Sequence, residues 1–383
     1  MAAYAAKLSK PLGAEALQAF RSFTVAHPRL IEARDELIEA IECAAPGSLI
    51  LVLGPPGVGK TTLMRKVQQG LTEKLAPQLE ADVGRLPFVA VEAVAPDNGS
   101  FNWRDHCRRM LMQMNEPLID QKIHSPYFEV ERDPNGQFAY SPRCLSGARR
   151  HHAIEQALRH RRPAAVFIDE AQHLARMSSG RRLADQLDVI KSIASRTQTI
   201  HVLLGTYELL SFRNLSGQLS RRSVDLHFAR YRAESKDDLR IFQNIVLTFQ
   251  GQLTCEQDVD LVGIWDFLYE RSLGCVGVLK DWLARSLNAA FRSAARLDRR
   301  MLERTALSTA QCEKILAEAR EGEARLIENH ESRSRLRCLL GLPEQAAKAD
   351  RETVTPPKRA RGLKPGVRRP KRDRIGRAMA PNA

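Results

Sequence analysis

The sequence of 383 residues lacks several patterns that would each define a class of protein. It has no Cys-X-X-Cys pair and no Cys/His cluster at zinc-ligand spacing, so its seven cysteines predict neither a zinc site nor a disulfide framework. No stretch approaches the ~18 to 20 apolar residues that a membrane span requires, and no apolar core follows a basic N-terminus. Internal repeats are absent as well. We therefore expect a cytoplasmic protein with reduced thiols and no membrane segment.

Acidic residues are in short supply, because 45 Asp and Glu face 59 Lys and Arg, which gives a formal charge of +14. Such an excess favours a polyanionic partner, either nucleic acid or an anionic membrane surface. Residues 353–383 alone hold ten Lys and Arg against Asp373, a net charge of +9. This stretch has almost no large apolar residues and cannot bury enough surface to fold alone. We expect a flexible basic tail that binds DNA, binds a protein partner, or only aids solubility.

Short runs of branched apolar residues alternate with helical patterns through the first two thirds of the chain. They lie at residues 48–53, 88–94, 164–168 and 200–204. Strands that alternate with helices indicate a parallel sheet with helices on both faces. After about Tyr231 the strand patterns stop and helical spacing continues, which predicts a separate, smaller all-α domain.

The most specific motif lies between the first predicted strand and the helix after it. It reads Gly54-Pro55-Pro56-Gly57-Val58-Gly59-Lys60-Thr61, followed by Thr62. This is the GxxxxGK[ST] pattern of a P-loop, whose glycines let backbone N–H groups wrap closely around phosphates. We expect the loop to bind ATP, with Lys60 on the β- and γ-phosphates and the Thr61 hydroxyl on Mg²⁺. A glycine-rich turn without function is disfavoured by the strand and helix on either side.

A second element is the apolar run that ends in Asp169 and Glu170. Alone this would be an ordinary solvated turn, but after a P-loop it is where the carboxylate on the Mg²⁺ side belongs. We expect Asp169 to hold Mg²⁺ through water and Glu170 to act as general base on the attacking water. A nucleotide kinase does not need that glutamate, so the pair favours ATP hydrolysis.

Two weaker elements follow. Thr206 ends the strand at 200–204 and is either a contact for the γ-phosphate or the start of a turn. Arg221 and Arg222 are either surface charge or an arginine finger that enters a neighbouring subunit's site.

Together these patterns predict an α/β P-loop fold with four parts. They are an N-terminal helical segment at 1–46, a nucleotide-binding core at 47–232, a helical lid at 233–342 and a basic flexible tail at 343–383.

The order of the motifs resembles an AAA+ ATPase core and, more narrowly, the TnsC/TniB-type regulators of DNA transposition, relatives of MuB. The narrower resemblance is carried by His27-Pro28, by Ile168-Asp169-Glu170-Ala171-Gln172-His173-Leu174, by Leu204-Gly205-Thr206, by Gln218-Leu219-Ser220-Arg221-Arg222 and by Gly274-Cys275-Val276-Gly277-Val278-Leu279-Lys280-Asp281-Trp282-Leu283. It covers roughly residues 20–290.

The resemblance implies a bacterial, DNA-associated ATPase that assembles as a ring or helical filament on duplex DNA. Such a protein marks a target site, meets a target-selection factor and recruits or activates the transposase, here through the C-terminal tail. The family places ATP between subunits, which gives Arg221 or Arg222 its function in trans.

DNA contacts implied by the resemblance fall on two segments, one with Asn102 and Arg104 and one with Arg149 and Arg150. Such contacts to phosphates give affinity without base specificity. Many AAA+ lids carry a sensor arginine in a GxxR setting, but Gly277-Val278-Leu279-Lys280 offers only Lys280 to the nucleotide.

Two other classes remain open. One is an ORC-like or STAND-like switch, in which ATP mainly stabilises one conformation. The other is a small-molecule P-loop kinase, which Glu170, the helical domain and the basic tail disfavour. No winged helix or repeat array, which a switch protein normally carries, is evident after residue 290.

Overall fold

The computed structural model describes nine stretches of the chain. They are residues 10–95, 101–124, 128–132, 138–142, 146–174, 181–213, 223–253, 260–327 and 330–342. Within these stretches, no helix combines the length and the apolar character that crossing a membrane would need. Two compact units divide at Leu326, and Met1–Leu326 contains the sheet and nearly all of the helices.

The centre of the first unit is a parallel sheet of five strands in the order β2-β5-β6-β1-β7. The strands are β1 Leu49–Leu53, β2 Phe88–Glu92, β5 Ala165–Asp169, β6 Ile200–Gly205 and β7 Ser223–His227. Strands β1, β5 and β6 are buried along their whole length, as continuous apolar runs predict. Strand β7 was not predicted, because its sequence is short, polar in part and only partly buried.

The strand order brings the predicted motifs to one edge. Strand β6 pairs with β1 on one side and with β5 on the other. All five strands run in the same direction, so the P-loop after β1, the acidic pair at the end of β5 and Thr206 after β6 leave the sheet at its carboxyl edge. This is where open α/β sheets bind their ligands.

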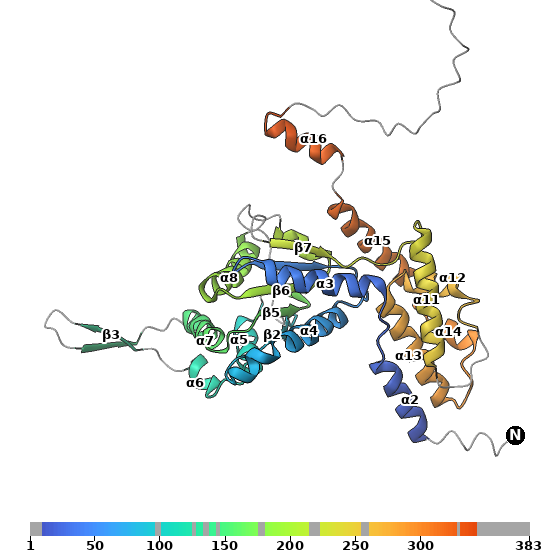
Figure 1. Ribbon diagram of the computed structural model, residues 1–383, viewed down its shortest axis with the longest axis horizontal. Coiled ribbons are helices and arrows are strands. Elements are labelled where there is room, and N and C mark those ends of the chain that lie inside the picture. The colour runs from blue at the N-terminus through green and yellow to red at the C-terminus, as the bar shows by residue number, and fades with distance from the viewer. Residues whose placement is uncertain are drawn as a thin grey trace, which may run out of the picture. The chain divides into compact units, whose positions relative to one another are not determined.

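Helices cover both faces of this sheet (Figure 1). Helices α3 (Pro28–Cys43) and α4 (Lys60–Ala81) share a core with one face, which includes Ile50, Val52 and Phe167. Helices α5 (Trp103–Gln113), α7 (Ser146–Arg161) and α8 (Arg181–Thr197) share a core with the other. The arrangement confirms the predicted α/β fold with a covered parallel sheet.

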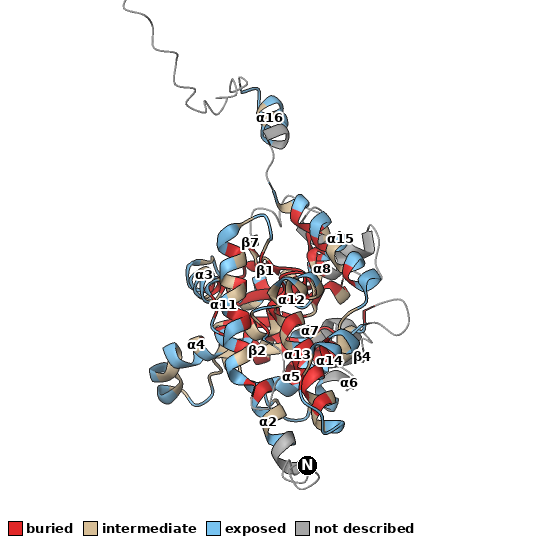
Figure 2. Ribbon diagram, turned by 90° about the vertical axis from the view of Figure 1, so that its right-hand side faces the viewer, coloured by how far each residue is buried: buried red, intermediate tan, exposed pale blue. Residues whose placement is uncertain are grey.

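A helical domain follows the sheet, as predicted. Its helices are α11 Lys236–Gln252, α12 Trp265–Ser272, α13 Val276–Arg292, α14 Arg299–Thr305 and α15 Thr309–Leu326. Helices α11 to α14 have their own core around the buried Trp282. The N-terminal helix α2 (Lys10–Ser22) contributes Phe20 to this core and packs on α13, whereas α3 packs on the sheet. In Figure 2 the buried residues gather where α11, α12 and α13 face one another.

The remaining elements are short. The segment between β2 and β5 holds α6 (Ile119–His124) and an antiparallel pair, β3 (Phe128–Arg132) with β4 (Phe138–Pro142). After β5 and β6 come the 3-10 turns η1 (Ala171–Leu174) and η2 (Tyr207–Leu209), the latter followed by α9 (Leu210–Arg213). The second unit contains α16 (His330–Leu339). The tail lies outside the described residues, and the boundaries between the four predicted parts stay predictions.

Candidate nucleotide site

The loop from Gly54 to Lys60 has the backbone that its glycines predict. Gly57 and Gly59 have φ values of 72° and 114°, in the left-handed region that favours glycine. Helix α4 begins at Lys60, so its free N–H groups and partial positive charge lie at the end of the loop. A Cβ at Gly54 would overlap the carbonyl oxygen of Phe228, so no other residue fits there.

Lys60 is buried within its own loop. Its Nζ donates to the carbonyl oxygens of Gly54 and Pro55, both at 3.0 Å. Burial lowers the pKa of the Lys60 ammonium, and the nearby carboxylates of Glu170 and Asp169 oppose that shift. A buried cation beside the start of a helix suits a polyanionic phosphate chain.

Thr61 and Asp169 meet across the sheet edge. The Thr61 hydroxyl donates to Asp169 Oδ2 at 2.7 Å, and Asp169 Oδ1 accepts from the Glu170 N–H at 2.9 Å. A hydroxyl and a carboxylate are the oxygen ligands that Mg²⁺ accepts beside phosphate and water. No cluster of three His, Cys, Asp or Glu side chains in the described stretches suggests another metal site. The residues present therefore fit the predicted Mg²⁺.

Glu170 has an unusual backbone conformation. Its φ of 51° places it in the left-handed region, which a non-glycine residue seldom adopts. Its side chain, held by a hydrogen bond from Gln172 Nε2 to Oε2, lies beside the loop. Conformations of this kind cluster at functional sites, where the surroundings fix them.

Thr206 completes this group. Its Oγ1 is buried and has no hydrogen-bond partner in the described structure, while its N–H donates to Gln172 Oε1 at 3.2 Å. A buried hydroxyl without a partner is costly unless a ligand satisfies it. We call Lys60, Thr61, Asp169, Glu170 and Thr206 the polar half of the site.

The lid closes on the loop through backbone atoms. The N–H of Val278, in the first turn of α13, donates to the carbonyl oxygen of Gly57 at 3.0 Å. A Cβ at Gly277 would overlap that same carbonyl, so glycine is required for this approach. Lys280 lies one turn further on, and its Nζ donates to the carbonyl oxygen of Arg21 at 2.7 Å.

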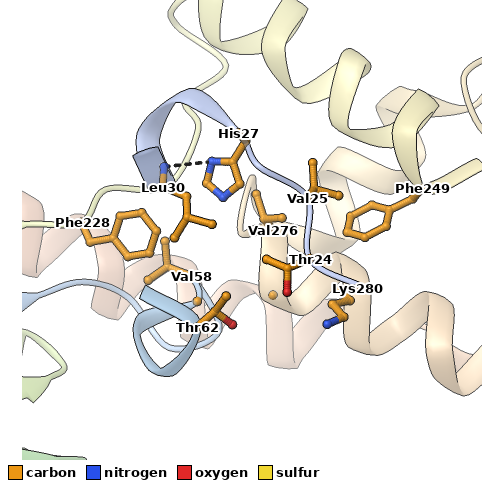
Figure 3. A pocket seen from close by; sticks show the side chains of 12 residues that line it. Thr24, Val25, His27, Leu30, Val58, Thr62, Phe228, Phe249, Val276 and Lys280 are labelled. Atoms are coloured by element: carbon orange, nitrogen blue, oxygen red, sulfur yellow. Dashed lines mark hydrogen bonds between the residues drawn. The ribbon is translucent and has the colours of Figure 1, made fainter. Parts of the chain in front are cut away.

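A small cavity of about 40 Å³ lies beside this contact (Figure 3). We call it the apolar half of the site. It is lined by Thr24, Val25, His27 and Leu30 before or in α3, by Val58 and Gly59 of the loop and Thr62 of α4, by Phe228 after β7, by Phe249 of α11, and by Val276, Gly277 and Lys280 of the lid. Five segments that are distant in sequence thus build one pocket next to the P-loop.

His27 orders the edge of this cavity. Its Nδ1 accepts from the Leu30 N–H at 3.3 Å and lies 2.9 Å from the Tyr231 hydroxyl, so His27 caps helix α3. Its ring is parallel to that of Phe228, and the two ring centroids are 6.4 Å apart. Burial, followed by the charge of Arg29, lowers the pKa of His27 to about 4, and the ring is therefore neutral at pH 7.

The other predicted residues are only partly placed. Asn102 caps α5 through Asp105 N–H, and Arg104 is exposed on its first turn. Arg149 and Arg150 lie in the first turn of α7, with side chains outside the described residues. The two helix starts are neighbours, because the Trp103 and His151 rings are 6.1 Å apart. Arg221 and Arg222 lie outside the described residues.

The sequence motifs predict Val58, Gly59, Thr62 and Lys280 at the nucleotide but give no function to the rest of the apolar half or to Gln172. The remaining residues of the apolar half form no sequence motif, because apolar side chains such as Val25 and Phe228 are typical of any hydrophobic core. The one signal was the short resemblance at His27-Pro28 and at Gly274 to Leu283.

Comparison with known proteins agrees with this geometry. Residues 44–212 match the family model described as an AAA domain. Comparison with curated proteins gives no match. Among solved structures, the Aeropyrum pernix ORC2 protein in ADPNP–ADP complexes aligns over 76% of this chain and 72% of its own, with 13% identity and a TM-score of 0.50.

Two further structures are similar at lower TM-scores. A Walker-type ATPase of Pyrococcus abyssi has a TM-score of 0.42 with 19% identity, covering 77% of this chain and 75% of its own. The Aeropyrum pernix ORC1 protein in complex with DNA has a TM-score of 0.46 with 19% identity, covering 73% of this chain and 65% of its own. The 13% identity with the ORC2 protein shows a shared fold and nothing finer.

The parallel sheet, the P-loop at its edge and the helical domain that follows define an AAA+ P-loop fold. The chain contains an AAA domain and is an ATPase.

Proposed function

We propose that ATP binds across both halves of the site and is hydrolysed there. The observation that carries this is the meeting of Lys60, Thr61 and Asp169 at the carboxyl edge of the sheet, with Glu170 next to them. The backbone N–H groups from Gly57 to Thr62, at the end of the loop and in the first turn of α4, bind the phosphates together with the Lys60 ammonium. Thr61 and Asp169 would hold Mg²⁺, which would supply positive charge against the phosphates.

In the reaction, water attacks the γ-phosphorus, the bond to the oxygen bridging to ADP breaks, and Glu170 accepts a proton from the water. ADP and phosphate are the products. Lys60 stabilises negative charge on the phosphoryl oxygens. Thr206 donates its free hydroxyl to the γ-phosphate or to the water, which satisfies the buried oxygen.

The adenine base belongs in the apolar half. The pocket is next to Gly59 and Thr62, and its other walls are mostly aliphatic and aromatic, which suits the flat faces of an aromatic base. Lys280 and the backbone of Gly277 contribute from the lid. Because Val278 holds Gly57, nucleotide binding and lid position depend on each other.

The process served by this ATPase is DNA transposition. The protein assembles on duplex DNA as a ring or filament, marks a target and recruits or activates the transposase, with a target-selection factor as a further partner. Support comes from the resemblance to TnsC/TniB-type proteins over residues 20–290 and from the formal charge of +14. Arg221 or Arg222 enters the ATP site of a neighbouring subunit. The DNA phosphates are contacted by Asn102, Arg104, Arg149 and Arg150. The C-terminal tail binds the transposase. A bacterial cytoplasm is the expected compartment.

The alternative is an ATP switch in another DNA-associated process. The ORC2 likeness favours it, since that protein shares the fold and was described with bound nucleotides. A switch stays a monomer or small oligomer when ATP binds, whereas a transposition regulator assembles along DNA.

The test is sedimentation and negative-stain imaging with a non-hydrolysable ATP analogue, with and without random-sequence duplex DNA at fixed salt. Lys60→Ala is the control without nucleotide. Rings or filaments that need both ATP analogue and DNA support the transposition regulator. A monomer that ignores DNA contradicts it and leaves the switch.

A further inference from the structure

Gln172 lies between the catalytic carboxylate and the end of β6. It belongs to η1, directly after the acidic pair, and its side chain is 3% exposed. Its Nε2 donates to Glu170 Oε2, and its Oε1 accepts from the N–H of Thr206 at 3.2 Å. The amide nitrogen of Gln172 therefore bonds to the residue after β5, and its amide oxygen bonds to the residue after β6.

The surroundings leave this side chain little freedom. A Cβ at Gly205 would overlap Gln172 Oε1 and crowd Leu209, so the glycine before Thr206 makes room for the carboxamide. Ala171 and Leu174, its neighbours on η1, are buried in the core on that face of the sheet. A planar amide fixed in this way transmits a shift of one partner to the other, because buried polar contacts are costly to break.

Both partners occupy special positions. Glu170 has the left-handed φ of 51°, so its carboxylate direction depends on side-chain contacts as well as on the backbone. Thr206 carries the buried hydroxyl without a partner. No other side chain in the described structure is hydrogen-bonded to both Glu170 and Thr206.

We infer that Gln172 is a positioning residue that couples Glu170 to Thr206, so that the glutamate is aligned on the attacking water only when the end of β6 is in its ATP-bound place. This rests on the proposed function of Glu170 as general base. The residue touches neither nucleotide nor water in this scheme. It acts by holding the carboxylate, so its loss lowers the rate of hydrolysis and spares nucleotide binding.

The test variant is Gln172→Met, which keeps the length and bulk of the side chain and removes both hydrogen bonds. We expect a kcat about 10- to 100-fold lower, since a small misplacement of a catalytic group has effects of this order. The dissociation constant of a non-hydrolysable ATP analogue and the KM should stay within about threefold. Gln69→Met, at an exposed position of the α4 helix, is the matched control and should leave all three unchanged.

Gln172→Asn is the second variant, because its amide is one methylene shorter and cannot reach both partners. If Gln172→Met does not bind the analogue, Gln172→Asn with normal binding and a reduced kcat still supports the coupling. Normal kcat in either folded variant would overturn it and leave Gln172 a packing residue.

Glu170→Gln separates this inference from the function on which it rests. Slow hydrolysis in Glu170→Gln together with normal kcat in Gln172→Met overturns the coupling alone. Normal hydrolysis in Glu170→Gln overturns both. When both single variants are slow, we expect the double variant to be no slower than Glu170→Gln, because residues that act as one unit are not additive.

Discussion

On the polar half of the site, Lys60 bonds to the residue directly after β1, and Thr61 bonds to Asp169, the last residue of β5. On the apolar half, the cavity is assembled from the chain before α3, the loop, the residue after β7, Phe249 of α11 and the start of α13. The polar half depends on side chains, whereas the lid contact depends on backbone atoms and on glycines without a Cβ. The phosphate-side residues thus come from local motifs, whereas the pocket proposed for the base depends on long-range packing.

The largest expected effect is in the polar half. Lys60→Ala removes the phosphate cation and should lower nucleotide affinity by at least about 100-fold, whereas Glu170→Gln should bind ATP normally and lower kcat by a similar factor. Equilibrium binding of a labelled ATP analogue and phosphate release measure the two effects. Equal loss of binding in both variants would contradict the assigned roles.

The lid contact should respond to a single methyl group. Gly277→Ala forces the α13 start away from the Gly57 carbonyl, and we expect nucleotide affinity to fall about tenfold, with a melting temperature lower by a few degrees. Gly251→Ala, at the end of α11 with nothing within 4 Å of its added Cβ, is the matched control. That control should leave affinity unchanged and raise stability by about 0.5–1 kcal/mol. An unaffected Gly277→Ala would show that the lid contact is not used.

Acid should weaken the fold through buried histidines. Burial lowers the pKa of His27, His106 and His201 to about 4 from the usual 6.5, so between these pH values the unfolded chain binds more protons than the folded one. The contribution of these histidines to the free energy of unfolding is therefore fully present above pH 6.5. It decreases as the pH falls towards 4, by on the order of 1–3 kcal/mol for each histidine. Denaturant unfolding at stepped pH measures this.

His27→Asn isolates the contribution of the apolar half. Asparagine keeps a side-chain acceptor for the cap of α3 but has no proton to gain. We expect the loss of stability between pH 6.5 and pH 4 to become smaller in this variant. An unchanged pH dependence would assign the effect to the other two histidines.

The smallest expected effect concerns Lys280. Its Nζ is already bonded to the Arg21 carbonyl at the edge of the cavity. Lys280→Met should lower the affinities for ATP and ADP equally, by less than about fivefold. Competition binding with the two nucleotides checks this, and a loss confined to ATP would instead make Lys280 a sensor of the γ-phosphate.

Much of the fold could be predicted from local patterns in the sequence. Strands β1, β5 and β6 are fully buried, so their sequences are continuous apolar runs that are easy to recognise. Strand β7 has mixed burial and gives no such run. The N-terminal helical pattern does not show that α2 packs its Phe20 with the lid while α3 packs on the sheet, because an amphipathic pattern shows that a face is buried but not against which part of the fold.

By itself, the sequence determined the polar half of the site, since the loop backbone needs glycines at 57 and 59 and the phosphate chemistry needs Lys60, Thr61 and an acidic pair after a strand. Only the tertiary structure decided that β6 lies between β1 and β5, that Gln172 joins Glu170 to Thr206, and that Gly277 rests on Gly57. The physical reason is that motifs specify short-range geometry, whereas strand order, pockets and the contacts of buried amides come from packing between segments far apart in the chain.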